Sequence, residues 1–156
     1  MNVVTINKLF REYGRTLGSV ESFTGGLFAR EITKVSGASH FFKGALVTYA
    51  SEEKNRILGI SYDVIDEYGV VSKEVAAQMA SNGQKLLNVD YCVSFTGNAG
   101  PTAMEGKPVG LIYIGIAIYD KVEVYEFHLS GDRDTIQNEG VINALKLLEQ
   151  KILENN

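Results

Sequence analysis

The chain has 156 residues, 45% of them hydrophobic, so its length and composition fit one domain with a substantial core. Nineteen acidic residues outnumber fifteen basic ones, which gives a net charge of −4. This balance, together with the lack of a dense basic run, argues against general nucleic-acid binding. Cys92 is the single cysteine, which excludes an internal disulfide and fits a reducing compartment.

The hydrophobic pattern predicts a series of helices and strands along the chain. The first segment reads as a short amphipathic helix rather than a secretory signal, because charged residues interrupt its apolar positions. The elements that follow are a strand over 16–23, a helix over 26–37, a strand over 41–50, a short helix over 51–59 and two helices over 61–69 and 72–87. Ser61 and Ser72 are the expected N-caps of the last two helices.

The second half of the chain is predicted to be richer in strands. A buried strand covers 90–97, and an apolar strand over 108–119 turns through a short connection into an antiparallel strand over 122–129. A final helix over 134–154 places one apolar row toward the core, namely Val141, Ala144, Leu145, Leu148 and Ile152. This order predicts a single domain over 1–156, an α/β fold built as a three-layer α/β/α sandwich with a mixed, mostly parallel sheet.

Several classes of protein find no support in the sequence. The longest apolar run is too short to cross a bilayer as a helix, so we expect a soluble cytoplasmic protein with no membrane partner. Neither a Walker loop nor a GxGxxG fingerprint occurs, and no cofactor is predicted. No HExxH motif or Cys/His cluster occurs either, so no metal is predicted.

Two predicted strands end in loops that combine hydroxyl side chains with glycines. The loop residues are Ser22, Thr24, Gly25 and Gly26 after the first strand, and Thr96, Gly97, Asn98 and Gly100 after the buried strand. Ligands of α/β sheets bind beyond the carboxyl ends of strands, and free amides at a helix start favour an anion. Taken alone, such a turn is more often structural than catalytic.

Three longer side chains complete the candidate site. Tyr49 and Lys54 lie across a strand end and the next helical turn, and Arg133 precedes the last helix. The ordinary alternatives are a strand tyrosine, a solvated lysine and a surface ion-pair arginine of little energetic weight. Arg133 at a helix start also suits a phosphate group.

The combination of motifs resembles a known family. The segments "ESFTGGLFAREIT", "GALVTYASEEKNRILGI", "YGVVSKEVA", "FTGNAGP", "GKPVGLIYIGIA" and "SGDRDTI" occur in the order and approximate spacing of the CinA C-terminal domain family. The resemblance runs from about Leu9 to Leu148 and is to the stand-alone, single-domain form, the PncC-type nicotinamide mononucleotide deamidases. It implies a mixed-sheet α/β/α fold and an amidase of pyridine nucleotide salvage, which converts nicotinamide mononucleotide to nicotinic acid mononucleotide and ammonia.

The resemblance also implies roles for individual residues. Ser22 matches the family's nucleophile, and Tyr49 and Lys54 match its other catalytic residues. The matched substrate-binding residues are Thr24, Gly25, Gly26, Thr96, Gly97, Gly100 and Arg133, the last on the phosphate side. The implied partner is a small-molecule nucleotide substrate, and a homo-oligomer is compatible with the sequence.

Some residues depart from the family's pattern. Phe23 replaces a cysteine, Ala50 and Ser51 replace the middle residues of "YSNE", and Asn98 stands where isoleucine is common. These changes alter the expected pocket wall. The alternative function is therefore a nucleotide-binding or interaction module of the same fold that has lost most or all turnover.

The expected chemistry is amide hydrolysis through a serine. Ser22 attacks the carboxamide carbon, and Lys54 accepts its proton, provided that burial or nearby positive charge lowers the lysine pKa. Tyr49 either relays the proton or orients Lys54. The amides around Gly25 and Gly26 are the expected oxyanion donors, an effect of about 3 kcal/mol per donor. His40 and His128 lie in no nucleophile motif, so a Ser-His-Asp arrangement has little support.

Overall fold

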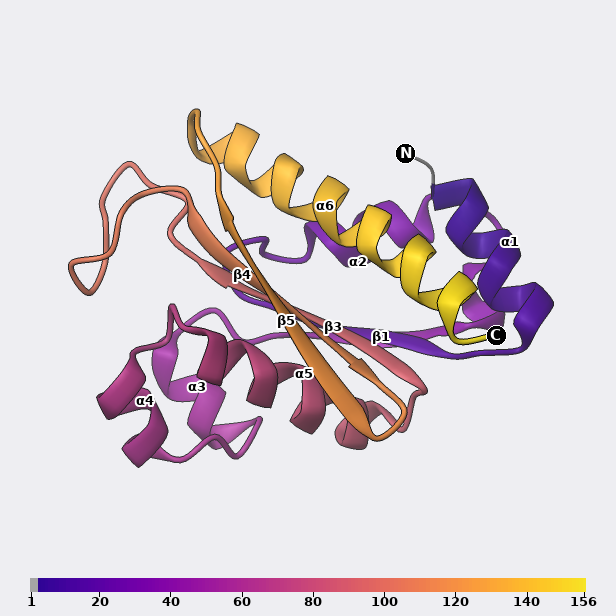
Figure 1. The fold of residues 1–156 in the computed structure, drawn as a ribbon, viewed down its shortest axis with the longest axis horizontal. Coiled ribbons are helices and arrows are strands. Elements are labelled where there is room, and N and C mark those ends of the chain that lie inside the picture. The colour runs from indigo at the N-terminus through magenta and orange to yellow at the C-terminus, as the bar shows by residue number, and fades with distance from the viewer. Residues whose placement is uncertain (1–2) are drawn as a thin grey trace.

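A five-stranded sheet forms the centre of the computed structural model, which describes residues 3–156 (Figure 1). Its strands are β1 (Leu17–Glu21), β2 (Phe42–Val47), β3 (Tyr91–Gly97), β4 (Leu111–Ile118) and β5 (Lys121–His128), in the spatial order β2-β1-β3-β4-β5. β1 pairs in parallel with β2 and β3, whereas β4 is antiparallel to both β3 and β5. The predicted mixed sheet is confirmed. Four strands run in one direction, although only two of the four pairings are parallel.

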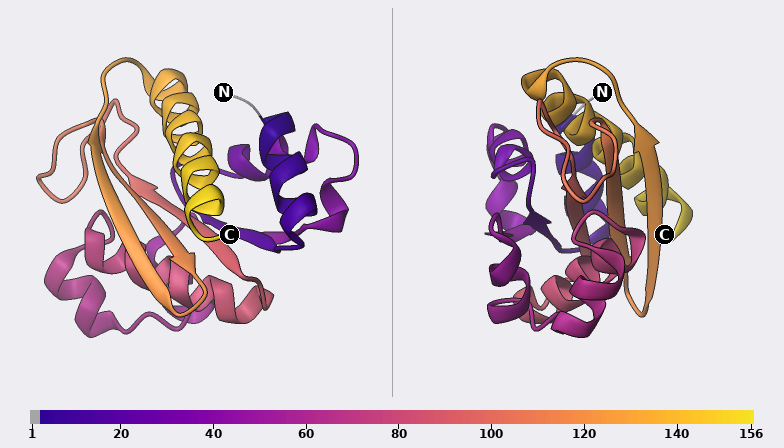
Figure 2. Two further views of the ribbon diagram at one scale, coloured as in Figure 1. Left: turned by 45° about the vertical axis from the view of Figure 1, so that its right-hand side comes forward. Right: turned by 90° about the vertical axis from the view of Figure 1, so that its left-hand side faces the viewer.

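Helices cover both faces of this sheet (Figures 1 and 2). One layer holds α1 (Val3–Tyr13), α2 (Leu27–Thr33) and α6 (Arg133–Glu154), and the other holds α3 (Ser51–Arg56), α4 (Tyr62–Tyr68) and α5 (Lys73–Leu87). A short 3₁₀ helix (Ala38–His40), which the sequence did not predict, precedes β2. The predicted three-layer α/β/α sandwich is confirmed.

The helices form where capping and burial favour them. The hydroxyls of Ser61 and Ser72 accept hydrogen bonds from the amides of Val64 and Val75, so both predicted N-caps are confirmed. The apolar row predicted on α6 is buried against the sheet, as expected for an amphipathic helix. No helix within residues 3–156 is long and apolar enough to span a membrane.

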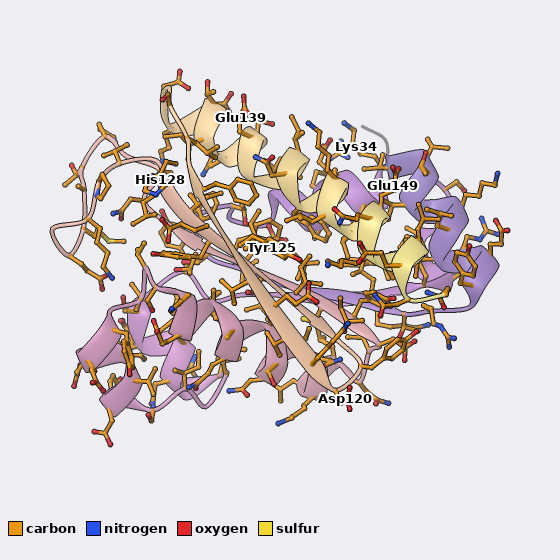
Figure 3. All side chains as sticks on the ribbon, in the orientation of Figure 1. Lys34, Asp120, Tyr125, His128, Glu139 and Glu149 are labelled. Carbon is orange, nitrogen blue, oxygen red and sulfur yellow. The ribbon has the colours of Figure 1, made fainter. Side chains whose placement is uncertain are left out.

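Strand β5 closes one side of the sheet beside α6. Figure 3 shows Asp120 at the turn from β4, Tyr125 midway along β5 and His128 toward its other end. Lys151 of α6 lies 2.8 Å from the carboxylate of Glu123 on β5, which ties the helix to this edge. Because β5 runs in the same direction as β1, β2 and β3, it ends at the same end of the sheet as they do, and α6 begins there.

The strand register brings three loop starts together at this carboxyl edge. Glu21, the last residue of β1, lies opposite Val47 of β2 and Phe95 of β3. The Ser22 amide donates to the Phe95 carbonyl at 3.1 Å, and the Thr48 amide donates to the Glu21 carbonyl at 2.9 Å. The loops that follow β1, β2 and β3 are thus neighbours, as parallel strands require.

Candidate active site

A cavity of about 450 Å³ opens at the carboxyl edge of the sheet. Seven of the ten predicted site residues line it, namely Ser22, Tyr49, Lys54, Thr96, Gly97, Gly100 and Arg133. Its remaining wall is made by Phe23, Ala50, Ser51, Glu52, Val70, Asn98, Ala99, Thr102 and Met104. The structure therefore assembles the seven predicted residues from four separate segments around one space, and Val70 comes from a fifth.

Ser22 and Lys54 meet inside this cavity. The Lys54 ammonium nitrogen lies 3.0 Å from the Ser22 Oγ and 2.9 Å from the Thr48 carbonyl oxygen. Lys54 belongs to α3, which follows β2, and its side chain is 1% exposed. A hydroxyl in contact with a buried amine has the geometry of a nucleophile beside its base.

Burial changes the protonation of Lys54. Loss of hydration lowers the pKa of Lys54 from 10.5 to about 8, and the negative charges of Glu105 and Glu52 oppose this shift. No carboxylate of residues 3–156 forms an ion pair with the Lys54 nitrogen. Its contacts are two neutral oxygens, so the unprotonated amine is accessible near neutral pH.

Tyr49 and Arg133 meet at the mouth of the cavity. One guanidinium nitrogen of Arg133 donates to the Tyr49 hydroxyl at 2.5 Å, and another donates to the Gly100 carbonyl at 2.6 Å. Tyr49 is 57% exposed. Its hydroxyl bonds to neither Lys54 nor Ser22 among the described residues, so the geometry groups Tyr49 with Arg133.

The loop after β3 forms the opposite wall. Thr96 is buried, and its hydroxyl donates to the Val70 carbonyl at 2.7 Å. The buried Asn98 side chain donates to the carbonyls of Met104 and Lys107 at 3.3 and 3.1 Å. Asn98 thus closes the 98–107 loop on itself, a structural role that explains an amide at this pocket position.

Gly97 allows this loop to leave the sheet beside β4. A Cβ atom there would lie 2.5 Å from the Ile112 side chain and 2.8 Å from its Cα. Gly100 has a φ of +83°, which other residues rarely adopt. Both glycines therefore shape the wall, while the Gly100 carbonyl also holds Arg133.

The structure puts Thr24, Gly25 and Gly26 outside the cavity lining. The Thr24 hydroxyl is buried and donates to the Glu21 carboxylate at 2.7 Å. The Gly25 amide donates to the Ser22 carbonyl at 3.0 Å, and the Gly26 amide donates to Glu21 at 3.2 Å. The amides predicted to stabilise an oxyanion are therefore already bonded within the turn, and that part of the expected mechanism needs other donors.

Glu21 is the site residue that sequence reasoning missed. This fully buried carboxylate accepts hydrogen bonds from the start of α2, including the amides of Phe28 and Ala29 at 3.0 Å. A signal was present in the sequence, because an acidic residue at the end of an apolar strand, one short turn before a helix, suits the positive end of the helix dipole.

Other candidate reactive groups lie elsewhere. His128 pairs with Glu126, and His40 contacts the Gly37 carbonyl. Cys92 is buried in β3, and burial raises the pKa of its thiol, which suppresses the reactive thiolate. None of these residues lines the cavity that holds Ser22.

A second cavity, of about 720 Å³, lies beside α1 and shares no lining residue with the first. Its wall includes Lys8, Arg11, Arg15 and His40. The hydroxyl of Thr16, also in this wall, donates to Asp90 and does not face an amine. The cavity beside α1 is larger, but its described wall holds no nucleophile–base pair. The cavity around Ser22 is therefore the candidate active site.

The chain is similar in sequence to longer proteins from several bacteria. A relative from Bacillus subtilis (strain 168) is 46% identical over 145 residues, covering 90% of this chain and 35% of its own length. A CinA-like protein from Endomicrobium trichonymphae is 42% identical over 147 residues, covering 94% of this chain and 34% of its own length. The chain thus spans about a third of the length of these relatives.

Solved structures share the fold over nearly the whole chain. The competence/damage inducible protein CihA from Agrobacterium tumefaciens is 30% identical with a TM-score of 0.90, covering 94% of this chain and 90% of that one. The competence damage-inducible protein A from Klebsiella pneumoniae superposes with a TM-score of 0.96 at 23% identity, covering 99% of this chain and 96% of that one. Residues 2–152 match the CinA C-terminal domain, and the chain belongs to that family.

Proposed function

We propose that the chain hydrolyses the carboxamide of nicotinamide mononucleotide, releasing ammonia and nicotinic acid mononucleotide. The observation that carries this proposal is the 3.0 Å contact between the Ser22 hydroxyl and the buried Lys54 amine. The lowered pKa of Lys54, about 8, supplies a usable fraction of neutral base at physiological pH. The CinA C-terminal fold and the match of the catalytic residues support this substrate class.

The proposed reaction proceeds through an acyl-enzyme. The neutral Lys54 amine accepts the Ser22 proton as Oγ bonds to the carboxamide carbon and the carbonyl electrons move to oxygen. When the tetrahedral intermediate collapses, the Lys54 ammonium donates the proton to the carboxamide nitrogen, the carbon–nitrogen bond breaks and ammonia leaves. Water, deprotonated by the same amine, then attacks the ester carbon, the bond from carbon to Ser22 Oγ breaks, and the Lys54 ammonium returns the proton to Oγ.

The proposed substrate is held at its phosphate end by Arg133. The guanidinium is directed to the cavity mouth by Gly100 and bonds to the Tyr49 hydroxyl, so both polar groups are available to a phosphate oxygen. In this arrangement Tyr49 acts in substrate binding rather than as a proton relay. The loop of Thr96, Gly97 and Gly100 supplies the wall against which the nucleotide lies.

The test is ammonia release from nicotinamide mononucleotide by the unmodified protein and by Ser22→Ala. We expect the variant to fold, as judged by circular dichroism, and to lose turnover. Ser81→Ala, on α5 and outside the cavity, is the matched control and should keep full activity. Ligand binding without ammonia release in the unmodified protein would favour the alternative, a nucleotide-binding module without turnover.

A further inference from the structure

The Glu21 carboxylate occupies the start of α2. The N-cap residue of this helix, Gly26, has no side chain with which to cap it. Glu21 takes over this role, because one of its oxygens accepts from Gly26 and Phe28 and the other accepts from Ala29. A carboxylate here also meets the positive end of the helix dipole. The helix start is therefore neutralised from within the chain.

The result is that each amide from Gly25 to Ala29 has an acceptor. Gly25 donates to the Ser22 carbonyl, Leu27 donates to the Thr24 carbonyl, and the other three donate to Glu21. The amides of Phe23 and Thr24, in the same turn, differ because they have no such acceptor among the described residues. Within residues 3–156, the N–H groups of Phe23 and Thr24 donate to no other group of the chain.

The peptide planes show from which sides these two N–H groups point away. In a trans peptide, the carbonyl and the following N–H point in opposite directions. The Ser22 carbonyl points into the turn toward the Gly25 amide, so the Phe23 N–H points out of the turn. The Phe23 carbonyl accepts from the Gln137 side chain of α6 at 2.8 Å, so the Thr24 N–H points away from α6.

We infer that the main-chain amides of Phe23 and Thr24 form the oxyanion site for Ser22, and that Glu21 is the positioning residue that holds them there. This inference rests on the proposed function. During the attack on the carboxamide, the new bond joins Ser22 Oγ to carbon, the carbonyl electrons move to oxygen, and the Ser22 proton goes to Lys54. The negative oxygen then accepts hydrogen bonds from the two amides.

A carboxylate fits this positioning task better than a neutral side chain. Its two oxygens only accept, and five donors converge on them, from Ser19, Thr24, Gly26, Phe28 and Ala29. A glutamine would turn an NH₂ group toward at least one of these donors. The turn would then shift, and a displacement of a few tenths of an ångström is enough to weaken oxyanion hydrogen bonds.

The direct test uses ¹⁵N-labelled protein and an alkyl fluorophosphonate. This probe forms a bond between Ser22 Oγ and phosphorus, fluoride leaves, and the phosphonyl oxygen takes the place of the oxyanion. We expect the Phe23 and Thr24 amide protons to move downfield on adduct formation, while those of Gly25 and Gly26 change little. Equal or larger changes at Gly25 and Gly26 would overturn the inference.

The second test is steady-state kinetics of Glu21→Gln with nicotinamide mononucleotide. We expect kcat to fall at least 30-fold, while KM changes less than threefold and the midpoint of the pH profile stays that of Lys54. Thr24→Val removes one hydrogen-bond donor to Glu21 and leaves the Glu21 charge in place. It should lower kcat between three- and tenfold. Thr33→Val, on the exposed side of α2, is the matched control and should change neither constant.

The outcomes separate this inference from the proposed function. If the unmodified protein releases no ammonia, the proposed function fails. If the phosphonyl adduct still forms, its amide shifts decide the oxyanion site, and if no adduct forms at Ser22, the oxyanion site is overturned as well. If the unmodified protein is active and folded Glu21→Gln has the same kcat, only the role of Glu21 is overturned. Should Glu21→Gln not fold, Thr24→Val decides, because an unchanged kcat there contradicts the positioning role.

Discussion

The pH dependence of the proposed reaction follows from the environment of Lys54. With burial lowering the pKa of Lys54 to about 8, roughly a tenth of the amine is neutral at pH 7 and roughly nine tenths at pH 9. If the neutral amine is the base, kcat/KM for ammonia release should rise about tenfold between these two values. The profile should level off above pH 9.

Charge neutralisation beside Lys54 should move this profile in a known direction. The Glu52 carboxylate, in the cavity wall, raises the pKa of Lys54 against the larger effect of burial. Glu52→Gln should therefore shift the midpoint to lower pH and increase kcat/KM at pH 7. Glu53→Gln is the matched control, because the Glu53 carboxylate pairs with Arg56 at 2.5 Å and is not among the causes of the Lys54 shift.

The assay is ammonia release at constant ionic strength from pH 6 to 9.5, with folding checked by circular dichroism at each end. A flat profile between pH 7 and 9 would refute the assignment of Lys54 as base. The assignment would also be refuted if the midpoint of the profile moved equally in Glu52→Gln and Glu53→Gln. That result would show an effect of the net charge of α3 rather than of a group inside the cavity.

Three further outcomes are expected. Relative to Lys54→Met, the free energy of unfolding of the unmodified protein, measured by urea denaturation, should rise by about 3 kcal/mol from pH 8 to 10.5, because the unfolded lysine binds a proton there that the folded one does not. Arg133→Ala should reduce kcat/KM for nicotinamide mononucleotide far more than for the dephosphorylated riboside, and equal losses would argue against phosphate recognition. Gly97→Ala should lower stability by about 1–3 kcal/mol in thermal denaturation, since its Cβ would overlap Ile112, and an unchanged melting temperature would contradict this packing.

Much of the fold was predictable because its signals are local. The Ser61 and Ser72 caps, the apolar row on α6 and the short turn between β4 and β5 each lie within one segment of the sequence. No local signal predicts the strand order, because β1 pairs with β2 and β3, which lie further along the chain. The resemblance of motifs, rather than periodicity, indicated that their loops share one site.

The sequence predicted seven of the residues that line the candidate site, but not the hydrogen bonds that they make. Ser22, Lys54 and Arg133 line the cavity, as the motifs suggested. The roles of Tyr49 and of the Gly25 and Gly26 amides depend on which partner each group finds, and partners from distant segments cannot be read from composition. Glu21 shows this most clearly. Its carboxylate accepts hydrogen bonds from amides of the turn and of the helix start, and these amides were expected to be free.

Glu21 and Lys54 illustrate how two buried ionisable groups at one strand edge take different roles. Five donors converge on the Glu21 carboxylate, so its oxygens are fixed as acceptors and it organises the main chain around Ser22. Within residues 3–156, the Lys54 nitrogen contacts only two polar groups, the Ser22 hydroxyl and the Thr48 carbonyl, and both are neutral. Neither oxygen compensates the lost hydration of an ammonium, which is why burial dominates the pKa of Lys54. In the proposed mechanism, the number and charge of the partners therefore distinguish the group that holds the turn, Glu21, from the base, Lys54.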